Sequence, residues 1–282
     1  MLPEDAELPP NHERVKSWNS LTPEEKKKEA RKMELYSGMV DNLDHNIGRL
    51  LNYLKDIGRY NNTLIVFMSD NGAAAEDFYY HPYYVPFLKK HFNDDYENMG
   101  NPDSYISYGP QWAEAGSAPF RYFKGFTTEG GMVAPMIISG IGIERKNEIS
   151  DQFITLLDIA PTFYEVAELT YPKEYEGRKI YPLKGESLIP FVSGQLDEIH
   201  NNDYVYGMEY GNLAMIRKGN WKIVNTQLPF DTANFELYNI LNDLAEKNNL
   251  QLSEPDIYEE LLGEWYKFAN EVKVQIPVPS GD

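Results

Sequence analysis

The sequence contains no cysteine among its 282 residues. This absence excludes disulfides, thiolate metal sites and a cysteine nucleophile. The chain also has no run of about 18 apolar residues, so no membrane-spanning helix is expected. Basic residues are outnumbered, because 26 Lys and Arg stand against 44 Asp and Glu, a formal net charge of −18. No general basic surface for nucleic acid is therefore expected, and an anionic substrate needs a local pocket of cations.

The first residues of the chain lack the apolar segment that a signal peptide requires. Residues 1–18, MLPEDAELPPNHERVKSW, contain acidic residues and prolines instead. As written, the chain is therefore expected to be cytoplasmic and to have no membrane partner, while the compartment stays open, with a periplasmic place as the alternative for a longer protein. Hydrophobic residues make up 42% of the sequence, which is enough for a packed core in one large domain or in a domain with a small appendage.

Residues 22–58 are typical of one long helix. Thr22, Pro23 and Glu25 fit a capped helix start, and Gly58 is placed to end the helix. Apolar residues recur at helical spacing, at Tyr36, Val40, Leu43, Ile47, Leu50 and Leu54. Together with the apolar strand that follows, this helix predicts half of a βαβ unit.

That strand, residues 63–68, ends on polar residues. Its continuous apolar character favours a place inside a parallel sheet, where ligands lie outside the carboxyl ends of the strands. Asp70 and Asn71 stand at this end, and Gly72 allows a sharp turn or a close approach to a ligand. Carboxylate and amide oxygens suit Ca²⁺ or Mg²⁺. Asp-Asn-Gly is also ordinary turn composition, so a metal site and a plain turn both stay open.

The connection over residues 73–123 is long and rich in aromatic residues. A connection of this length in a compact domain usually lines or covers a site. Lys124 follows it among small and aromatic residues, where its ammonium could meet an anionic group, although most lysines are solvated surface groups. Residues 136–139 then predict a second apolar strand.

The last third of the chain predicts a smaller unit. Residues 204–211, 213–224 and 235–240 alternate as antiparallel strands do, with a turn at Lys218-Gly219-Asn220. Residues 255–273 predict an amphipathic helix that covers one face of this sheet. We therefore place a domain boundary near residue 195, with an α/β part over 1–195 and a sheet-and-helix subdomain over 196–282.

Several ordered blocks carry a specific resemblance. GRYNNTLIVFMSDNGA, ENMGNPDSYISYGPQWAEAGSAPFRYFKGFTTEGG and ITLLDIAPTFYEVA are similar to consecutive blocks of bacterial arylsulfatases of the alkaline-phosphatase superfamily. LKGESLIPFVSG, AMIRKGNWKIV and ELYNILNDLAEKNNL resemble the closing part of that family. The match is colinear from about residue 22 to the C-terminus, which makes it far more specific than any single motif.

The resemblance implies a fold, a reaction and three site residues. The fold is α/β and alkaline-phosphatase-like, with a partial parallel-type sheet flanked by helices and the small C-terminal antiparallel sheet. The reaction is hydrolysis of a sulfate ester to an alcohol or phenol and sulfate, with a formylglycine nucleophile. Asp70 and Asn71 match the family's Ca²⁺ ligands, and Lys124 matches the lysine that contacts the sulfate group. A divalent ion and an ammonium suit this reaction because they neutralise the sulfate oxygens.

The nucleophile of the family has no counterpart in this chain. It derives from Cys or Ser in a Cys/Ser-x-Pro-x-Arg motif near the start of the family domain. Ser117 to Arg121, SAPFR, fits that pattern, but it lies just before Lys124 and not after a first strand. The family's Asp-Asp pair, catalytic histidines and second substrate lysine are also absent, and Val133 stands where many relatives place an arginine.

The chain therefore resembles the C-terminal portion of a sulfatase. We expect a weak, incomplete Ca²⁺ site and no sulfatase activity from the chain alone. A partial parallel sheet exposes an edge, through which another chain could associate. Two alternatives stay open: a non-catalytic pseudoenzyme fragment or partner subunit of a split sulfatase, and a phosphoryl-transfer relative within the same superfamily.

Overall fold

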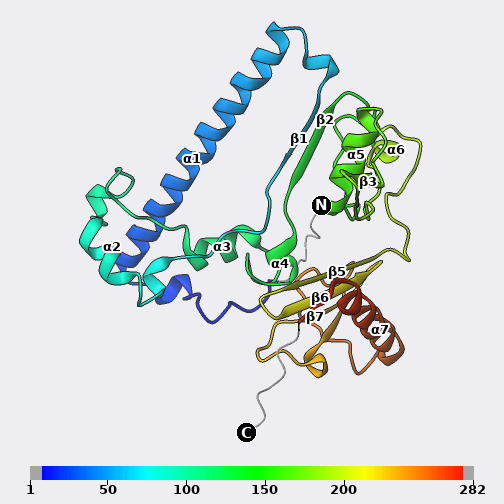
Figure 1. Ribbon diagram of the computed structural model, residues 1–282. Coiled ribbons are helices and arrows are strands. Elements are labelled where there is room, and N and C mark those ends of the chain that lie inside the picture. The colour runs from blue at the N-terminus through cyan, green and yellow to red at the C-terminus, as the bar shows by residue number, and fades with distance from the viewer. Residues whose placement is uncertain (1–7, 276–282) are drawn as a thin grey trace. The chain divides into compact units, whose positions relative to one another are not determined.

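A computed structural model describes residues 8–275 (Figure 1). Contacts group the described chain into two units, each discontinuous in sequence. The first unit contains residues 48–68 and 135–204, and the second contains residues 8–47, 69–134 and 205–275. The domain boundary near residue 195 stays a prediction. Among residues 8–275, no helix combines the length and the apolar character that crossing a membrane requires.

The long helix α1 spans Pro23–Asp56 and is capped as its sequence predicts. The amide of Thr22 donates to Glu25 Oε2 at 2.9 Å, and the amide of Glu25 donates to Thr22 Oγ1 at 3.2 Å. This reciprocal pair satisfies two of the helix's free N–H groups. At the other end Gly58 adopts a φ of 68°, the left-handed conformation that ends many helices. The apolar stripe of α1 stays outside the described core, since no residue of the helix is buried.

In the first unit, the strands β1 (Leu64–Met68) and β2 (Met136–Gly140) form an antiparallel pair. The expected parallel-type sheet is thus wrong for these two strands. Apolar patterning indicates that a strand is buried on both faces, but it does not specify the direction of its partner. Leu64 and Ile138 pack against a small core of Ile143, Phe191 and Val192.

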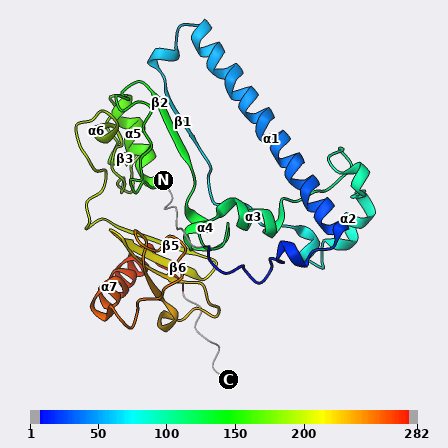
Figure 2. The same cartoon turned by 180° about the vertical axis from the view of Figure 1, so that it is seen from behind.

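The short helix α6 supplies Phe191 and Val192 of that core, and α5 and α6 lie on one side of the pair. Figures 1 and 2 show α5 and α6 beside β1 and β2 in both views. Their bounds are Ile159–Val166 for α5 and Ile189–Val192 for α6, with a short hairpin of β3 (Glu174–Tyr175) and β4 (Arg178–Lys179) between them. Pro161 falls in the first turn of α5, where its missing N–H costs no hydrogen bond.

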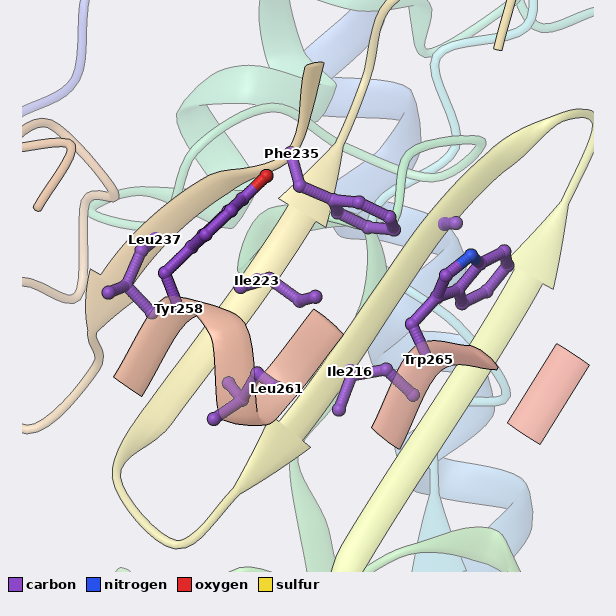
Figure 3. Close-up of a cluster of buried hydrophobic side chains, with 8 residues drawn as sticks. Ile216, Ile223, Phe235, Leu237, Tyr258, Leu261 and Trp265 are labelled. Carbon is purple, nitrogen blue, oxygen red and sulfur yellow. The ribbon is translucent and has the colours of Figure 1, made fainter. Parts of the chain in front are cut away.

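In the second unit, a four-stranded antiparallel sheet follows the predicted order. Its strands are β5 (Val205–Tyr210), β6 (Leu213–Lys218), β7 (Trp221–Asn225) and β8 (Glu236–Asn239), paired in sequence order. The helix α7, Pro255–Val272, covers one face. Figure 3 shows Tyr258, Leu261 and Trp265 of this helix directed at sheet side chains such as Ile216 and Ile223.

The other face of this sheet is covered as well. Met132 of the short helix α4 (Glu129–Met132) packs against Met215, Val224 and Tyr238. Two further helices of this unit, α2 and α3, span Val85–His91 and Gly109–Ser117. The sheet is therefore buried on both sides, with α7 on one and the α4 turn on the other.

Candidate functional site

Asp70 and Asn71 lie on the turn that directly follows β1. Asp70 is exposed and Asn71 is partly buried. The Ser69 hydroxyl donates to the backbone carbonyl of Asn71 at 2.9 Å, which tightens this turn. Their position after the last residue of an apolar strand is the one that the sequence predicts.

The backbone brings Lys124 next to this turn. The amide of Lys124 donates to the carbonyl of Ala73 at 3.0 Å, two residues after Asn71. The Lys124 ammonium lies 3.1 Å from Glu76 Oε1, and both side chains are partly exposed, Lys124 at 37% and Glu76 at 51%. The three residues assigned by resemblance thus come from two segments that are hydrogen-bonded together, with a carboxylate already paired to the lysine.

The turn rests closely on the start of α4. The amide of Gly72 donates to the carbonyl of Gly131 at 3.2 Å. A Cβ on Gly72 would lie 2.2 Å from the carbonyl oxygen of Gly130, a distance that no side chain tolerates. Gly72 therefore serves a close approach between two backbone segments, whereas the sequence predicts a sharp turn or a close approach to a ligand.

Two protein oxygens are too few for a complete Ca²⁺ shell. The ion takes six to eight oxygen ligands in proteins, and Asp70 and Asn71 have the right donor chemistry for two of them. Across residues 8–275, no three His, Asp or Glu side chains gather as a metal-binding group. The donor types fit a divalent cation, and the donor count requires further ligands from water or from another polypeptide.

Ser117 lies at the end of α3 and is buried, at 8% exposure. Its hydroxyl has no hydrogen-bond partner within the described part of the chain. A serine nucleophile needs both access to its substrate and an adjacent base. The interpretation that its SAPFR motif is not a nucleophile motif stays a prediction.

Charged side chains of the second unit form ion pairs that the sequence did not predict. Lys222 of β7 is fully buried, and its ammonium lies 2.7 Å from Glu129 Oε1 and 2.9 Å from Glu246 Oε1. Arg121, three residues before Lys124, donates to Glu236 Oε2 at 2.9 Å and to the Tyr238 hydroxyl at 3.0 Å. One feature of the sequence could have indicated this cluster: Lys222 lies within the otherwise mostly apolar strand Trp221–Asn225.

Comparison with known proteins identifies the chain's relatives. The sulfatase family model matches residues 8–169, more than half of the chain. A protein of Schizosaccharomyces pombe named "Uncharacterized sulfatase PB10D8.02c" is 40% identical over 267 residues, which covers 92% of this chain and 47% of that protein. The chain belongs to the sulfatase family. The resemblance inferred from the sequence blocks is confirmed.

Other sulfatases match over shorter parts. The arylsulfatase of Klebsiella aerogenes is 40% identical over 181 residues, covering 64% of this sulfatase chain and 39% of that enzyme. The chain thus spans about half the length of the curated relatives it matches. The similarity to arylsulfatases therefore concerns only part of their length.

Solved structures show the same fold. The structure titled "Ps i-CgsB in complex with k-i-k-neocarrahexaose" superposes with a TM-score of 0.60 at 23% identity, covering 89% of this chain and 48% of that one. The structure of BT4656 in complex with D-glucosamine-2-N,6-O-disulfate gives a TM-score of 0.54 at 22% identity, covering 86% and 41%. At these identities the likeness concerns the fold, which is the alkaline-phosphatase-like α/β class.

Proposed function

We propose that this sulfatase chain contributes the cationic side of a sulfate-ester hydrolase site. The observation that carries the proposal is the hydrogen bond between the Lys124 amide and the Ala73 carbonyl, because it places the lysine beside the Asp70–Asn71 turn. The reaction is hydrolysis of a sulfate ester by water to an alcohol or phenol and inorganic sulfate. The substrate is thus an anion, and it meets a local cation on a chain of charge −18.

In this site Asp70 and Asn71 hold Ca²⁺, or Mg²⁺, through their side-chain oxygens, and Lys124 donates hydrogen bonds to sulfate oxygens. The bound ion supplies positive charge that stabilises the sulfate oxygens as charge builds on the leaving oxygen. Lys124 adds a second positive charge from the neighbouring segment. Glu76 competes for the same ammonium, so the sulfate group must displace its carboxylate from Lys124.

The chain alone is proposed to lack turnover. It has no cysteine from which a formylglycine could form, and its one serine in a Cys/Ser-x-Pro-x-Arg pattern is buried. A covalent sulfo-enzyme therefore needs a nucleophile from outside these residues. The incomplete set of metal ligands points the same way, because two oxygens bind the ion weakly.

A second candidate function is that of a partner subunit, and one observation favours it. In the first unit, the β1–β2 pair has an apolar face with large exposed residues, including Phe67 at 44% and Ile137 at 63%. The cross-strand pairing of these two residues places them on the same face, opposite the covered Leu64 and Ile138. We infer that another polypeptide associates through the exposed edge of this sheet, packs on this face and supplies the missing site residues.

Calorimetric titration of the purified chain with Ca²⁺ and with inorganic sulfate tests the proposal. We expect Ca²⁺ binding weaker than about 1 mM that Asp70→Ala abolishes and the exposed control Asp44→Ala leaves intact. Lys124→Met should remove sulfate binding, whereas Glu76→Gln should strengthen it at low salt, because the competing charge is gone. The control for the lysine is Lys89→Met, on the exposed side of α2.

Activity assays on the same samples separate the alternatives. Turnover of p-nitrophenyl sulfate by the pure chain would contradict the half-site. Turnover of p-nitrophenyl phosphate in preference to the sulfate would favour the phosphoryl-transfer alternative. Equal Ca²⁺ binding by the wild-type chain and Asp70→Ala would remove the metal site from the Asp70–Asn71 turn.

A further inference from the structure

We propose that the buried ion cluster of Glu129, Lys222 and Glu246 positions both halves of this site, Lys124 and the Asp70–Asn71 turn. The inference rests on the proposed function and goes beyond it, because it makes the C-terminal sheet a working part of the site. These three residues act through other groups and are therefore positioning residues. The argument starts from the sheet face on which the cluster lies.

Polar side chains form a row across the sheet face opposite α7. The register pairs Arg217 of β6 with Lys222 of β7, and Lys222 with Tyr238 of β8. Their neighbours Met215 and Val224 pack with Met132 of α4, so this face is the one that the α4 turn covers. A lysine in the middle of a buried sheet is costly unless it is paired, which makes its partners informative.

The partners of Lys222 come from outside the sheet. Its ammonium lies 2.7 Å from Glu129 at the start of α4 and 2.9 Å from Glu246 in the segment after β8. The amide of Glu129 donates to Glu246 Oε2 at 2.9 Å, and Arg217 Nη1 lies 3.8 Å from Glu129 Oε2. Glu129 is thus held through its backbone and its side chain, which fixes the first residue of α4.

Electrostatics keep this cluster ionised at Glu129 and Lys222. Burial alone would raise the pKa of Glu129, but Lys222 and Arg217 outweigh burial and hold the pKa below its ordinary value. Burial alone would lower the pKa of Lys222, yet Glu129 and Glu246 raise it. Burial and the neighbouring Glu129 raise the pKa of Glu246. The Glu129–Lys222 ion pair is therefore the charged centre of the cluster.

A second tether holds the opposite end of the Lys124 segment to the same sheet face. Arg121 binds Glu236 and Tyr238 of β8, at 2.9 and 3.0 Å. The Arg121 carbonyl in turn accepts from the Gly130 amide at 2.9 Å and from the Thr128 hydroxyl at 2.7 Å. Residues 121–130 therefore form a closed loop fixed at both ends, with Lys124 inside it.

The same anchor reaches the metal-binding turn through the backbone. Glu129 fixes the start of α4, and Gly131, two residues later, accepts the hydrogen bond from the Gly72 amide. Gly72 directly follows Asp70 and Asn71. The ion cluster thus fixes the position of α4, and both the Asp70–Asn71 turn and the Lys124 loop are hydrogen-bonded to α4. Supporting contacts of this kind keep site residues in their working geometry.

A variant without the charges tests whether the cluster positions the site or only stabilises the fold. The triple variant Lys222→Met, Glu129→Gln, Glu246→Gln removes every charge of the trio with little change in volume, and such replacement is often tolerated. Leu261→Ala is the matched control, because it lowers stability from the α7 face of the same sheet. Arg121→Met is a second variant, which cuts the other tether and leaves the trio intact.

Two readouts distinguish positioning from stability. We expect the triple variant to weaken Ca²⁺ and sulfate binding by about 10-fold to 100-fold, the usual effect of losing a supporting contact. Hydrogen–deuterium exchange of the Gly72 and Lys124 amides should quicken in the triple variant and in Arg121→Met. Leu261→Ala should lower the unfolding temperature and leave both readouts at these segments unchanged.

The outcomes that contradict the inference are separate from those that contradict the proposed function. Wild-type affinity and wild-type exchange in the triple variant would overturn the positioning role. If the triple variant does not fold, unchanged exchange at Gly72 and Lys124 in Glu246→Met overturns it instead, because this variant removes one carboxylate partner of Lys222 and the acceptor of the Glu129 amide. Absence of Ca²⁺ and sulfate binding by the wild-type chain would refute the proposed function, and the exchange rates would still decide the positioning.

Discussion

At the scale of single residues, His12 links the start of the chain to the aromatic side chains around Lys124. Its ring lies 4.9 Å from the Tyr122 ring and 5.1 Å from those of Phe123 and Phe126, measured between centroids. Its Nδ1 accepts from the Arg14 amide at 3.1 Å, which requires the unprotonated nitrogen. Burial, and then Arg14, lower the pKa of His12 from 6.5. The folded chain therefore favours neutral His12.

This lowered pKa predicts a pH-dependent stability. Below pH 6.5 His12 is protonated in the unfolded chain but stays neutral in the folded chain until the pH reaches its lowered pKa. The free energy of unfolding therefore falls as the pH drops from 6.5 toward that lowered pKa. His12→Phe should flatten this part of the profile. Unfolding temperatures measured between about pH 5 and pH 8 check it, with the exposed His45→Gln as the control. A wild-type slope in His12→Phe would assign the dependence to other groups.

Single residues also show which parts of the site the sequence predicts. Asp70, Asn71 and Lys124 stand in recognisable local patterns, a strand end and a glycine-rich loop, and the backbone brings their segments together. Glu129, Lys222 and Glu246 are widely separated in sequence and come together only because α4 and the segment after β8 pack on the sheet. The pairing of Glu76 with Lys124 has the same origin, because it depends on how the loop folds back.

At the scale of elements, the approach of the Asp70–Asn71 turn to α4 depends on glycine. A Cβ on Gly72 would meet the Gly130 carbonyl oxygen at 2.2 Å and the Gly131 carbonyl carbon at 3.0 Å. Both are backbone atoms that no rotamer change can move aside. The turn and α4 must therefore separate if residue 72 carries a side chain.

Gly72→Ala is expected to destabilise the chain by about 1–3 kcal/mol through this overpacking, and to weaken Ca²⁺ binding at the turn. Gly38→Ala is the matched control, because Gly38 lies within α1 and an added Cβ would meet no atom within 4 Å apart from the neighbouring backbone of the helix itself. It should stabilise the chain by up to about 1 kcal/mol, as alanine does in helices. Denaturant unfolding of both variants measures the two effects. A neutral Gly72→Ala would show that the two segments do not touch in solution.

The elements themselves divide into those that local chemistry specifies and those that it does not. The limits of α1 follow from Thr22, Glu25 and Gly58, and the C-terminal strands follow from their alternation. The pairing of β1 and β2 does not follow, because an apolar strand has the same pattern beside a parallel or an antiparallel neighbour. Direction is set by the path of the whole chain between residues 68 and 136.

At the scale of the whole molecule, a strongly acidic chain carries apolar surfaces that no described residue covers. The net charge of −18 disfavours association between copies through mutual repulsion. The apolar face of the β1–β2 pair, with Phe67 and Ile137, favours association, and the exposed apolar residues of α1 add to it. These two effects oppose each other, and salt weakens only the first.

Self-association that increases with salt is therefore expected of the purified chain. The double variant Phe67→Lys, Ile137→Thr should suppress self-association at every salt concentration. The substitutions remove the apolar contact and add a positive charge, and exposed strand positions accept lysine and threonine. Tyr181→Ser is the matched control, since Tyr181 is more exposed, at 91%, and lies outside the β1–β2 face. Sedimentation velocity at low and high salt measures the result. A wild-type chain that stays monomeric at high salt would show that the β1–β2 face does not mediate self-association. If the double variant still associates, the contact lies on another surface, and the proposed binding place of a completing polypeptide must be sought there.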